Sequence, residues 1–139
     1  MSSVELPRPL VNQLLHYAQI NPEKEVCGLI SGKQGVLQQC HPISNTAEQP
    51  QQRFAMDDAQ LVNTLRQIRE QNEQLLAIFH SHPSAPAEPS ITDIKEDQYP
   101  DVMKLIISLN TDGVLEMQAF YTRNGEIEPV ELRLAHGDG

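Results

Sequence analysis

The feature of the sequence that most restricts its fold is the unbroken apolar run Leu75–Phe79, which leads directly into His80-Ser81-His82-Pro83. Five consecutive apolar residues leave no polar face, so a strand made from them must be covered on both sides. Pro83 disfavours a helical conformation at the residue before it, which keeps the segment extended. The run therefore predicts a central strand over residues 75–82, buried on both faces of a sheet.

Hydrophobic periodicity predicts the elements around this strand. Apolar residues recur at helical spacing over 8–20 and over 57–72, where Asp57 and Asp58 are first-turn acids, and Ser90-Ile-Thr-Asp opens a short helix. Loops are expected at the polar segment 44–52 and the proline-rich segment 83–89. Further strands are predicted over 26–30, 36–43, 102–109, 114–122 and 127–134, with glycine-containing turns at 31–35, 112–113 and 124–125.

The order of these elements predicts a single α/β domain in which helices pack on a mixed sheet. The chain has 139 residues, enough for one compact domain with its own core. We therefore expect one domain over residues 1–139, with a core over about 8–134 and a frayed tail over 135–139. No internal repeat is present.

The charge of the chain excludes some classes of partner. Its 19 acidic and 10 basic residues give a formal net charge of −9, so no basic surface is expected for nucleic acid or for an anionic membrane. The N-terminus does not resemble a signal peptide, and no apolar run approaches the roughly 20 residues of a membrane span. Cys27 and Cys40 are too few for a disulfide framework. These features predict a cytoplasmic protein with reduced thiols, and they leave its oligomeric state open.

The end of the central strand carries a candidate metal site. His80 and His82 are two residues apart in a strand, so their imidazoles project from the same side. Asp93, in the opening turn of the short helix, is the nearest suitable third ligand. Two histidines and one carboxylate leave a fourth position for water, which is typical of catalytic zinc with bonds of about 2.0–2.1 Å. The pattern predicts one Zn²⁺, with a bound water acidified towards a pKa of roughly 7.

A hydrolytic site also needs a base for the water and a donor for the oxyanion. Glu25 precedes the strand at 26–30 and can serve as general base if that strand lies beside the central one. Ser90 lies three residues before Asp93, on the same helical face, and is the candidate oxyanion donor. Two simpler interpretations stay open: Ser90 and Asp93 form a helix-capping pair, and Glu23 competes with Glu25 for the base.

Several other polar residues are assigned structural roles. Cys27 would share a strand face with Glu25, and we expect a buried, inert thiol rather than a nucleophile. Asn45 either contacts substrate or makes local turn hydrogen bonds. Packing or surface roles are expected for the isolated His16 and His136 and for the pair Cys40-His41.

The complete set, Glu25, then His80-Ser81-His82-Pro83, then Ser90 and Asp93, resembles the signature of the JAMM (MPN+) metallopeptidase family. The segment Glu25–Gly32 is similar to the family's first strand, and Asn45, Pro50 and Phe54 resemble its middle stretch. The resemblance covers about residues 10–120, and the short chain looks more like the small prokaryotic members.

This resemblance implies a cytidine-deaminase-like fold and zinc-dependent hydrolysis of peptide or isopeptide bonds. It also implies, as substrate, a ubiquitin-like or sulfur-carrier protein cut after its C-terminal glycines. Two other hypotheses remain. The same two-histidine, one-carboxylate set suits a non-haem iron(II) oxygenase. A catalytically silent scaffold module of the same fold would need no metal, although such members typically lack the ligands that this chain keeps.

Overall fold

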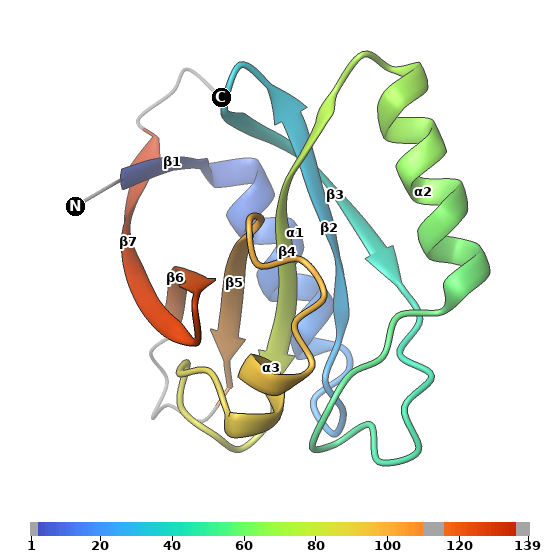
Figure 1. Cartoon of the computed structure of the whole chain (residues 1–139), viewed down its shortest axis with the longest axis vertical. Coiled ribbons are helices and arrows are strands. Elements are labelled where there is room, and N and C mark those ends of the chain that lie inside the picture. Colours follow the sequence, from blue (N-terminus) through green and yellow to red (C-terminus); the bar gives the residue numbers. More distant parts are fainter. Residues whose placement is uncertain (1–2, 110–115, 136–139) are drawn as a thin grey trace.

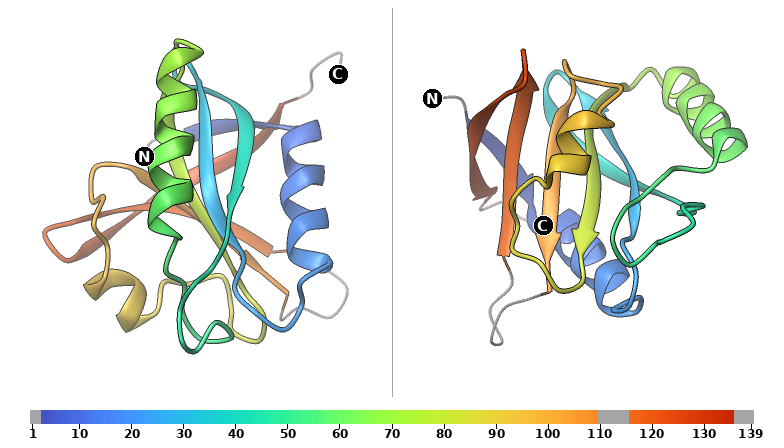
Figure 2. Two further views of the ribbon diagram at one scale, coloured as in Figure 1. Left: turned by 90° about the vertical axis from the view of Figure 1, so that its right-hand side faces the viewer. Right: turned by 60° about the horizontal axis from the view of Figure 1, so that its bottom comes forward.

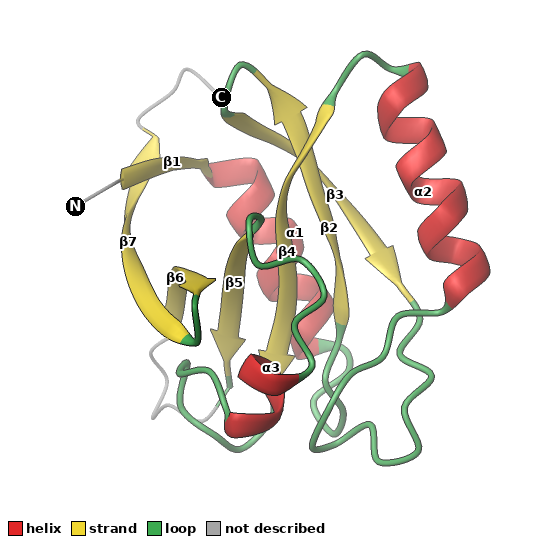
Figure 3. Ribbon diagram, viewed as in Figure 1, coloured by secondary structure: helices red, strands yellow, loops and turns green. Residues whose placement is uncertain are grey.

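A computed structural model describes residues 3–109 and 116–135 of the chain. Within these ranges the chain forms one seven-stranded sheet and three helices (Figure 3). The elements in chain order are β1 (Ser3–Pro7), α1 (Arg8–Gln19), β2 (Cys27–Lys33), β3 (Val36–Ile43), α2 (Asp58–Glu70), β4 (Gln74–His82), α3 (Ile91–Lys95), β5 (Met103–Ser108), β6 (Glu116–Arg123) and β7 (Glu126–Ala135).

The sheet lies between α1 on one face and α2 with α3 on the other (Figures 1 and 2). Strand β4 explains this arrangement, because Ile78 and Phe79 point to opposite faces. Ile78 packs in a cluster with Ile68 of α2, whereas Phe79 packs in a cluster with Leu10 and Leu14 of α1. The predicted burial of the central strand on both faces is therefore confirmed.

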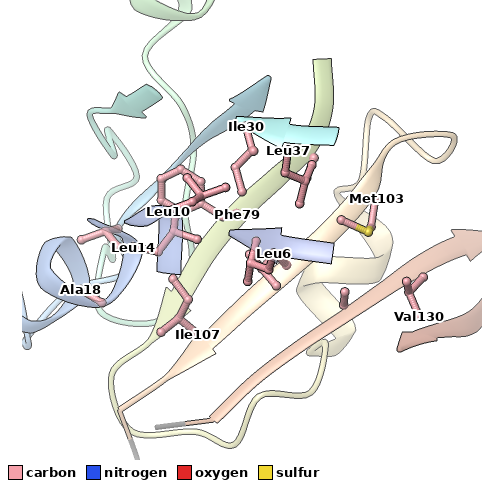
Figure 4. Close-up of a cluster of buried hydrophobic side chains, with 14 residues drawn as sticks. Leu6, Leu10, Leu14, Ala18, Ile30, Leu37, Phe79, Met103, Ile107 and Val130 are labelled. Atoms are coloured by element: carbon pink, nitrogen blue, oxygen red, sulfur yellow. The ribbon is translucent and has the colours of Figure 1, made fainter. Parts of the chain in front are cut away.

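The larger core lies on the α1 side and reaches across the whole sheet (Figure 4). Leu10, Leu14 and Ala18 recur at helical spacing on α1 and are each at most 2% exposed. They pack with residues of all seven strands, among them Leu6, Ile30, Leu37, Phe79, Ile107, Ala119 and Val130. Burying a set of large apolar side chains, at roughly 1.5–3 kcal/mol each, is the main force that holds α1 on the sheet.

The strand order is β1-β7-β6-β5-β4-β2-β3, with parallel pairs β1–β7 and β4–β5 and antiparallel pairs elsewhere. The mixed sheet that the sequence predicts is thus confirmed. Strand β4 lies between β5 and β2, and its register with β2 pairs Cys27 with His80. Gly28 keeps these strands close, because a Cβ there would lie 2.7 Å from the ring of Phe79.

The structure corrects three details of the predicted elements. No strand was predicted at the N-terminus, yet β1 pairs with β7 and buries Leu6. The turn predicted over 31–35 is shorter, because β2 continues through Lys33 and only Gln34 and Gly35 turn, both with positive φ. Ala135, which was predicted to begin the frayed tail, is instead the last residue of β7 and pairs with Pro7. The turn predicted at 112–113, the start of the strand predicted at 114 and the tail residues 136–139 lie outside the described residues.

Among residues 3–109 and 116–135, no helix is long and apolar enough to cross a membrane.

Candidate metal centre

His80 and His82 at the end of β4 meet Asp93 of α3 in a tight cluster. Their Nε2 atoms are 3.2 Å apart, and Asp93 Oδ2 lies 3.3 Å from His80 Nε2 and 3.2 Å from His82 Nε2. Tetrahedral zinc with bonds of about 2.0–2.1 Å requires ligand atoms separated by about 3.3–3.4 Å. The three donor atoms therefore have the spacing of three corners of such a tetrahedron.

Neighbouring groups orient two of these three side chains. His82 Nδ1 lies 2.8 Å from the carbonyl oxygen of Pro86, so this nitrogen carries the proton and Nε2 presents its lone pair to the cluster. Asp93 is held by a capping box: the Ser90 amide donates to Asp93 Oδ2 at 2.8 Å, and the Asp93 amide donates to Ser90 Oγ at 3.0 Å. The loop after β4 and the start of α3 thus preorganise the donor atoms.

Glu25 reaches this cluster because β2 runs antiparallel to β4. The pairing of Cys27 with His80 continues to Val26 and Ser81, whose backbone groups are joined by a 3.0 Å hydrogen bond from the Ser81 amide. Glu25 therefore lies across from His82, and one donor atom from each of Glu25 and the three candidate ligands lies within 4.8 Å of all the others. The adjacency on which the proposed base depends is present in the fold.

The carboxylate of Glu25 is buried but poorly satisfied. The residue is 3% exposed, and its Oε1 has no hydrogen-bond partner within the described residues. An unpartnered buried carboxylate oxygen is rare in a folded protein and indicates a functional group or ion that completes it. By contrast, the competing Glu23 is exposed. The chemistry of the four side chains thus fits a divalent cation with a carboxylate beside it.

The environment shifts the pKa values of this cluster in different directions. Burial raises the pKa of Glu25 from 4.5 to about 7, and the nearby Asp93 adds to this increase while His82 opposes it. Burial also lowers the pKa of His80, which favours the neutral, metal-binding form. Burial alone would raise the pKa of Asp93, but its hydrogen bonds with His80 and His82 outweigh this and hold it well below its usual range. A carboxyl group with a pKa near 7 is suited to accept and return a proton at neutral pH.

A cavity of about 410 Å³ lies beside His80 and Asp93. One wall is the segment Phe54–Met56, in which the ring of Phe54 stacks on the imidazole of His80 with a centroid distance of 4.5 Å. Residues 92, 93 and 95–99 also line the cavity, together with Ile78 and Phe120. His80 and Asp93 themselves line this cavity, so it reaches two of the three candidate metal ligands.

The same cavity contains a buried ion pair that the sequence analysis missed. Lys104 Nζ lies 3.0 Å from Asp97 Oδ2, and it also donates to the carbonyl oxygens of Tyr99 and Val102. Asp97 accepts further hydrogen bonds from the Thr122 hydroxyl and the Tyr99 amide. The isolated lysine within the apolar β5 segment was the available signal, since a buried lysine requires a partner.

The remaining residues that the sequence singled out have local partners. Cys27 is fully buried and donates to the Ile43 carbonyl oxygen, and burial raises the pKa of its thiol to about 12, as expected for an inert thiol. His41 lies 2.7 Å from Ser31 Oγ. Asn45 makes the local turn hydrogen bonds that were one of its two predicted roles. Cys40 is half-buried, His16 is exposed, and His136 lies outside the described residues.

Comparisons with known proteins agree with the geometry. Residues 7–121 match the family described as prokaryotic homologs of the JAB domain. A desampylase from Haloferax volcanii is 31% identical over 90 residues, which are 63% of this chain and 65% of that protein. A probable TtuB-protein conjugate cleaving protease from Thermus thermophilus is 32% identical over 121 residues, 87% of this chain and 77% of that protein. A CysO-cysteine peptidase from Mycobacterium tuberculosis is 26% identical over 126 residues, 88% and 86% of the two chains.

Solved structures share the fold. A protein from Desulfitobacterium hafniense superposes with a TM-score of 0.88 at 25% identity, over 96% of this chain and 94% of that one. A JAB1/MPN domain protein from Archaeoglobus fulgidus gives a TM-score of 0.61 at 19% identity, over 97% and 100% of the two chains. The predicted fold class is confirmed, and the expectation of a peptidase agrees with the names of the relatives. The family match over residues 7–121 and the relative at 32% identity show that the chain belongs to the prokaryotic homologs of the JAB domain.

Proposed function

We propose that this chain is a zinc-dependent peptidase or isopeptidase that cuts after the C-terminal glycines of a ubiquitin-like or sulfur-carrier protein. The observation that carries the proposal is the buried, unpartnered Oε1 of Glu25 beside the cluster of His80, His82 and Asp93. The names of the relatives support the substrate class, because they include cleavage of TtuB-protein conjugates and of CysO-cysteine. The cytoplasm is the location we expect for this reaction.

In this proposal His80, His82 and Asp93 hold one zinc ion, which supplies the charge that acidifies a water molecule and polarises the scissile carbonyl. Glu25 accepts the proton of the attacking water on its carboxylate and returns it to the leaving amine. In the metal-free protein, burial raises the pKa of this carboxyl group to about 7, which favours acceptance of a proton. The Ser90 hydroxyl accepts a hydrogen bond from the Asp93 amide, and its own proton can be donated to the oxyanion.

The cavity beside the centre is the proposed site for the extended tail of the substrate. Lys104 and Asp97 line this cavity and neutralise each other, so the pair does not oppose binding of an uncharged, apolar stretch. The lining segments Phe54–Met56 and 95–99 would contact the tail. Such positioning brings the scissile carbonyl to Glu25 and the metal in one orientation.

The direct test combines metal analysis with a cleavage assay. Zinc-loaded protein is incubated with ubiquitin-like carriers that have C-terminal extensions, and the products are weighed by mass spectrometry. We expect a cut after glycine, loss of hydrolysis with stoichiometric zinc in Glu25→Gln, and loss of zinc in His80→Ala and Asp93→Ala. A fully active Glu25→Gln protein would reject the assigned base.

The same preparation separates the alternatives. Bound iron together with oxygen-dependent turnover would favour the oxygenase, and freshly purified protein with zinc content near zero would favour the scaffold module.

A further inference from the structure

The position of Glu25 depends on its backbone rather than on its side chain. Oε1 has no hydrogen-bond partner, and the hydrogen bonds of Glu25 within the described residues are made by its amide and its carbonyl group. Glu25 also lies before the first residue of β2, so the sheet ladder does not include it. Whatever holds these backbone groups therefore determines where the carboxylate lies.

Asn45 holds the carbonyl side of Glu25 through the loop between β3 and α2. Its Nδ2 donates to the Glu25 carbonyl oxygen at 2.9 Å and to the Arg53 carbonyl oxygen at 3.0 Å, while its Oδ1 accepts from the amides of Ala47 and Ala55, each at 3.0 Å. Carbonyl groups on one side and amides on the other fix the orientation of the Asn45 amide. One side chain thus folds the loop and attaches it to the proposed base.

The other backbone contacts come from the same loop and from β4. The Glu25 amide donates to the Pro50 carbonyl oxygen at 2.7 Å, within the loop that Asn45 organises. Ser81, between the two candidate histidine ligands, accepts a 2.9 Å hydrogen bond from the Val26 amide on its Oγ. Ser81 is fully buried, so this hydrogen bond is protected from water.

The geometry points to Asn45 and Ser81 as positioning residues that together fix Glu25 against the metal centre, an inference that rests on the proposed role of Glu25 as general base. Neither side chain is assigned to substrate or to metal. A misplacement of about 1 Å at a reacting group lowers the rate roughly 10²-fold, so two hydrogen bonds to the backbone have a large effect on turnover.

The substitution Asn45→Asp separates the two halves of the Asn45 network. Aspartate keeps an oxygen for the amides of Ala47 and Ala55 but loses the donor to the Glu25 carbonyl group. We expect kcat to fall about tenfold to 100-fold while KM and zinc affinity, measured by chelator competition, stay within about twofold. In the metal-free protein, the Glu25 amide should exchange with deuterium at least about tenfold faster by NMR.

The matched control is Gln60→Ala. Gln60 joins the base of the same loop to α2 through Ser44, with hydrogen bonds of 2.8 and 3.0 Å, and does not contact Glu25. We expect parent values of kcat and parent exchange at Glu25 and Val26. An equal fall of kcat in Gln60→Ala would mean that general loosening of the loop is responsible, and would overturn the inference.

The second variant, Ser81→Ala, removes the hydrogen bond that the Val26 amide donates to Ser81 Oγ. It also keeps the inference testable if Asn45→Asp does not fold. It should lower kcat at constant KM and accelerate exchange of the Val26 amide. Parent kcat in both variants, while Glu25→Gln is inactive, would overturn the positioning role and leave the proposed function intact. Full activity of Glu25→Gln would reject the proposed function, and the exchange rates would still report whether the backbone contacts hold Glu25 in place.

Discussion

Glu25 and Asp97 are both carboxylates shielded from water, yet their surroundings are opposite. Glu25 lies at the candidate metal centre, and its Oε1 has no hydrogen-bond partner among residues 3–109 and 116–135. Asp97 lines the cavity beside that centre. It forms an ion pair with Lys104 and accepts hydrogen bonds from Thr122 and Tyr99. Within the described part of the chain, Glu25 therefore has a buried carboxylate oxygen without a hydrogen bond, whereas the carboxylate of Asp97 in the same region has both an ion pair and hydrogen bonds.

The difference separates a group available for chemistry from a group that maintains structure. Burial without a donor destabilises the charged form of Glu25 and raises its pKa, so a bound cation would stabilise that charge. Asp97 and Lys104 instead attach the segment after α3 to β5, which keeps α3 and Asp93 in place. Removing the partner of Asp97 should therefore destabilise the protein, whereas replacing Glu25 by a neutral residue should stabilise its metal-free form.

The largest effect is expected from Lys104→Met, which removes the only side-chain cation that the described residues provide for Asp97. The variant leaves an uncompensated buried charge and two carbonyl groups without their donor. We expect the free energy of unfolding, measured with urea, to fall by about 3–5 kcal/mol. Adding Asp97→Asn should recover part of this loss, because the amide is neutral. A loss below about 1 kcal/mol in Lys104→Met would show that water compensates Asp97.

The second largest effect is expected from Glu25→Gln, which should stabilise the metal-free protein. A carboxyl group whose folded pKa is raised stabilises the protein below its unfolded pKa, near 4.5, and this stabilisation is lost as the pH rises through about 7. Glutamine cannot ionise, so metal-free Glu25→Gln should be more stable than the metal-free parent at pH 8, by about 2–3 kcal/mol. The difference should disappear near pH 4. Urea unfolding at both pH values checks this, and a less stable variant at pH 8 would contradict it.

The parts of the site that the sequence could predict are those that follow from local spacing. His80 and His82 follow from the two-residue period of a strand, and Ser90 with Asp93 follows from the spacing of a helix start. Both are local rules, and the structure brings these four residues together as expected. The serine is the N-cap, as the simpler interpretation had it, and its catalytic role stays a prediction.

Contacts between residues far apart in the sequence could not be predicted from these local rules. Glu25 joins the site only because β2 lies antiparallel to β4, and the match to a family motif, rather than the residues themselves, supplied that expectation. No local sequence pattern indicates that Asp97 and Lys104 form an ion pair. Strand β1 was missed because Val4 and Leu6 are too short an alternation to show a strand alone, and its pairing with β7 is a contact between the two ends of the chain.

A smaller effect is expected at Phe54, which lines the cavity beside the candidate metal centre. Its ring stacks on His80, and such a contact contributes about 0.5–1.5 kcal/mol. Phe54→Leu keeps an apolar side chain but loses the stacking. We expect zinc affinity, measured by chelator competition, to fall roughly twofold to tenfold. Unchanged affinity would show that β4 alone orients the imidazole.

The smallest effect concerns the ion pair between Arg53 and Glu96, in which the charged atoms are 3.4 Å apart and Glu96 lines the same cavity. Both side chains are about half exposed, so water and salt screen the attraction that burial strengthens between Lys104 and Asp97. Arg53→Gln should therefore change the free energy of unfolding by less than about 0.5 kcal/mol, with little dependence on salt. A loss as large as that of Lys104→Met would mean that ionic contacts in this region stabilise the fold regardless of exposure, and that burial is not what distinguishes them.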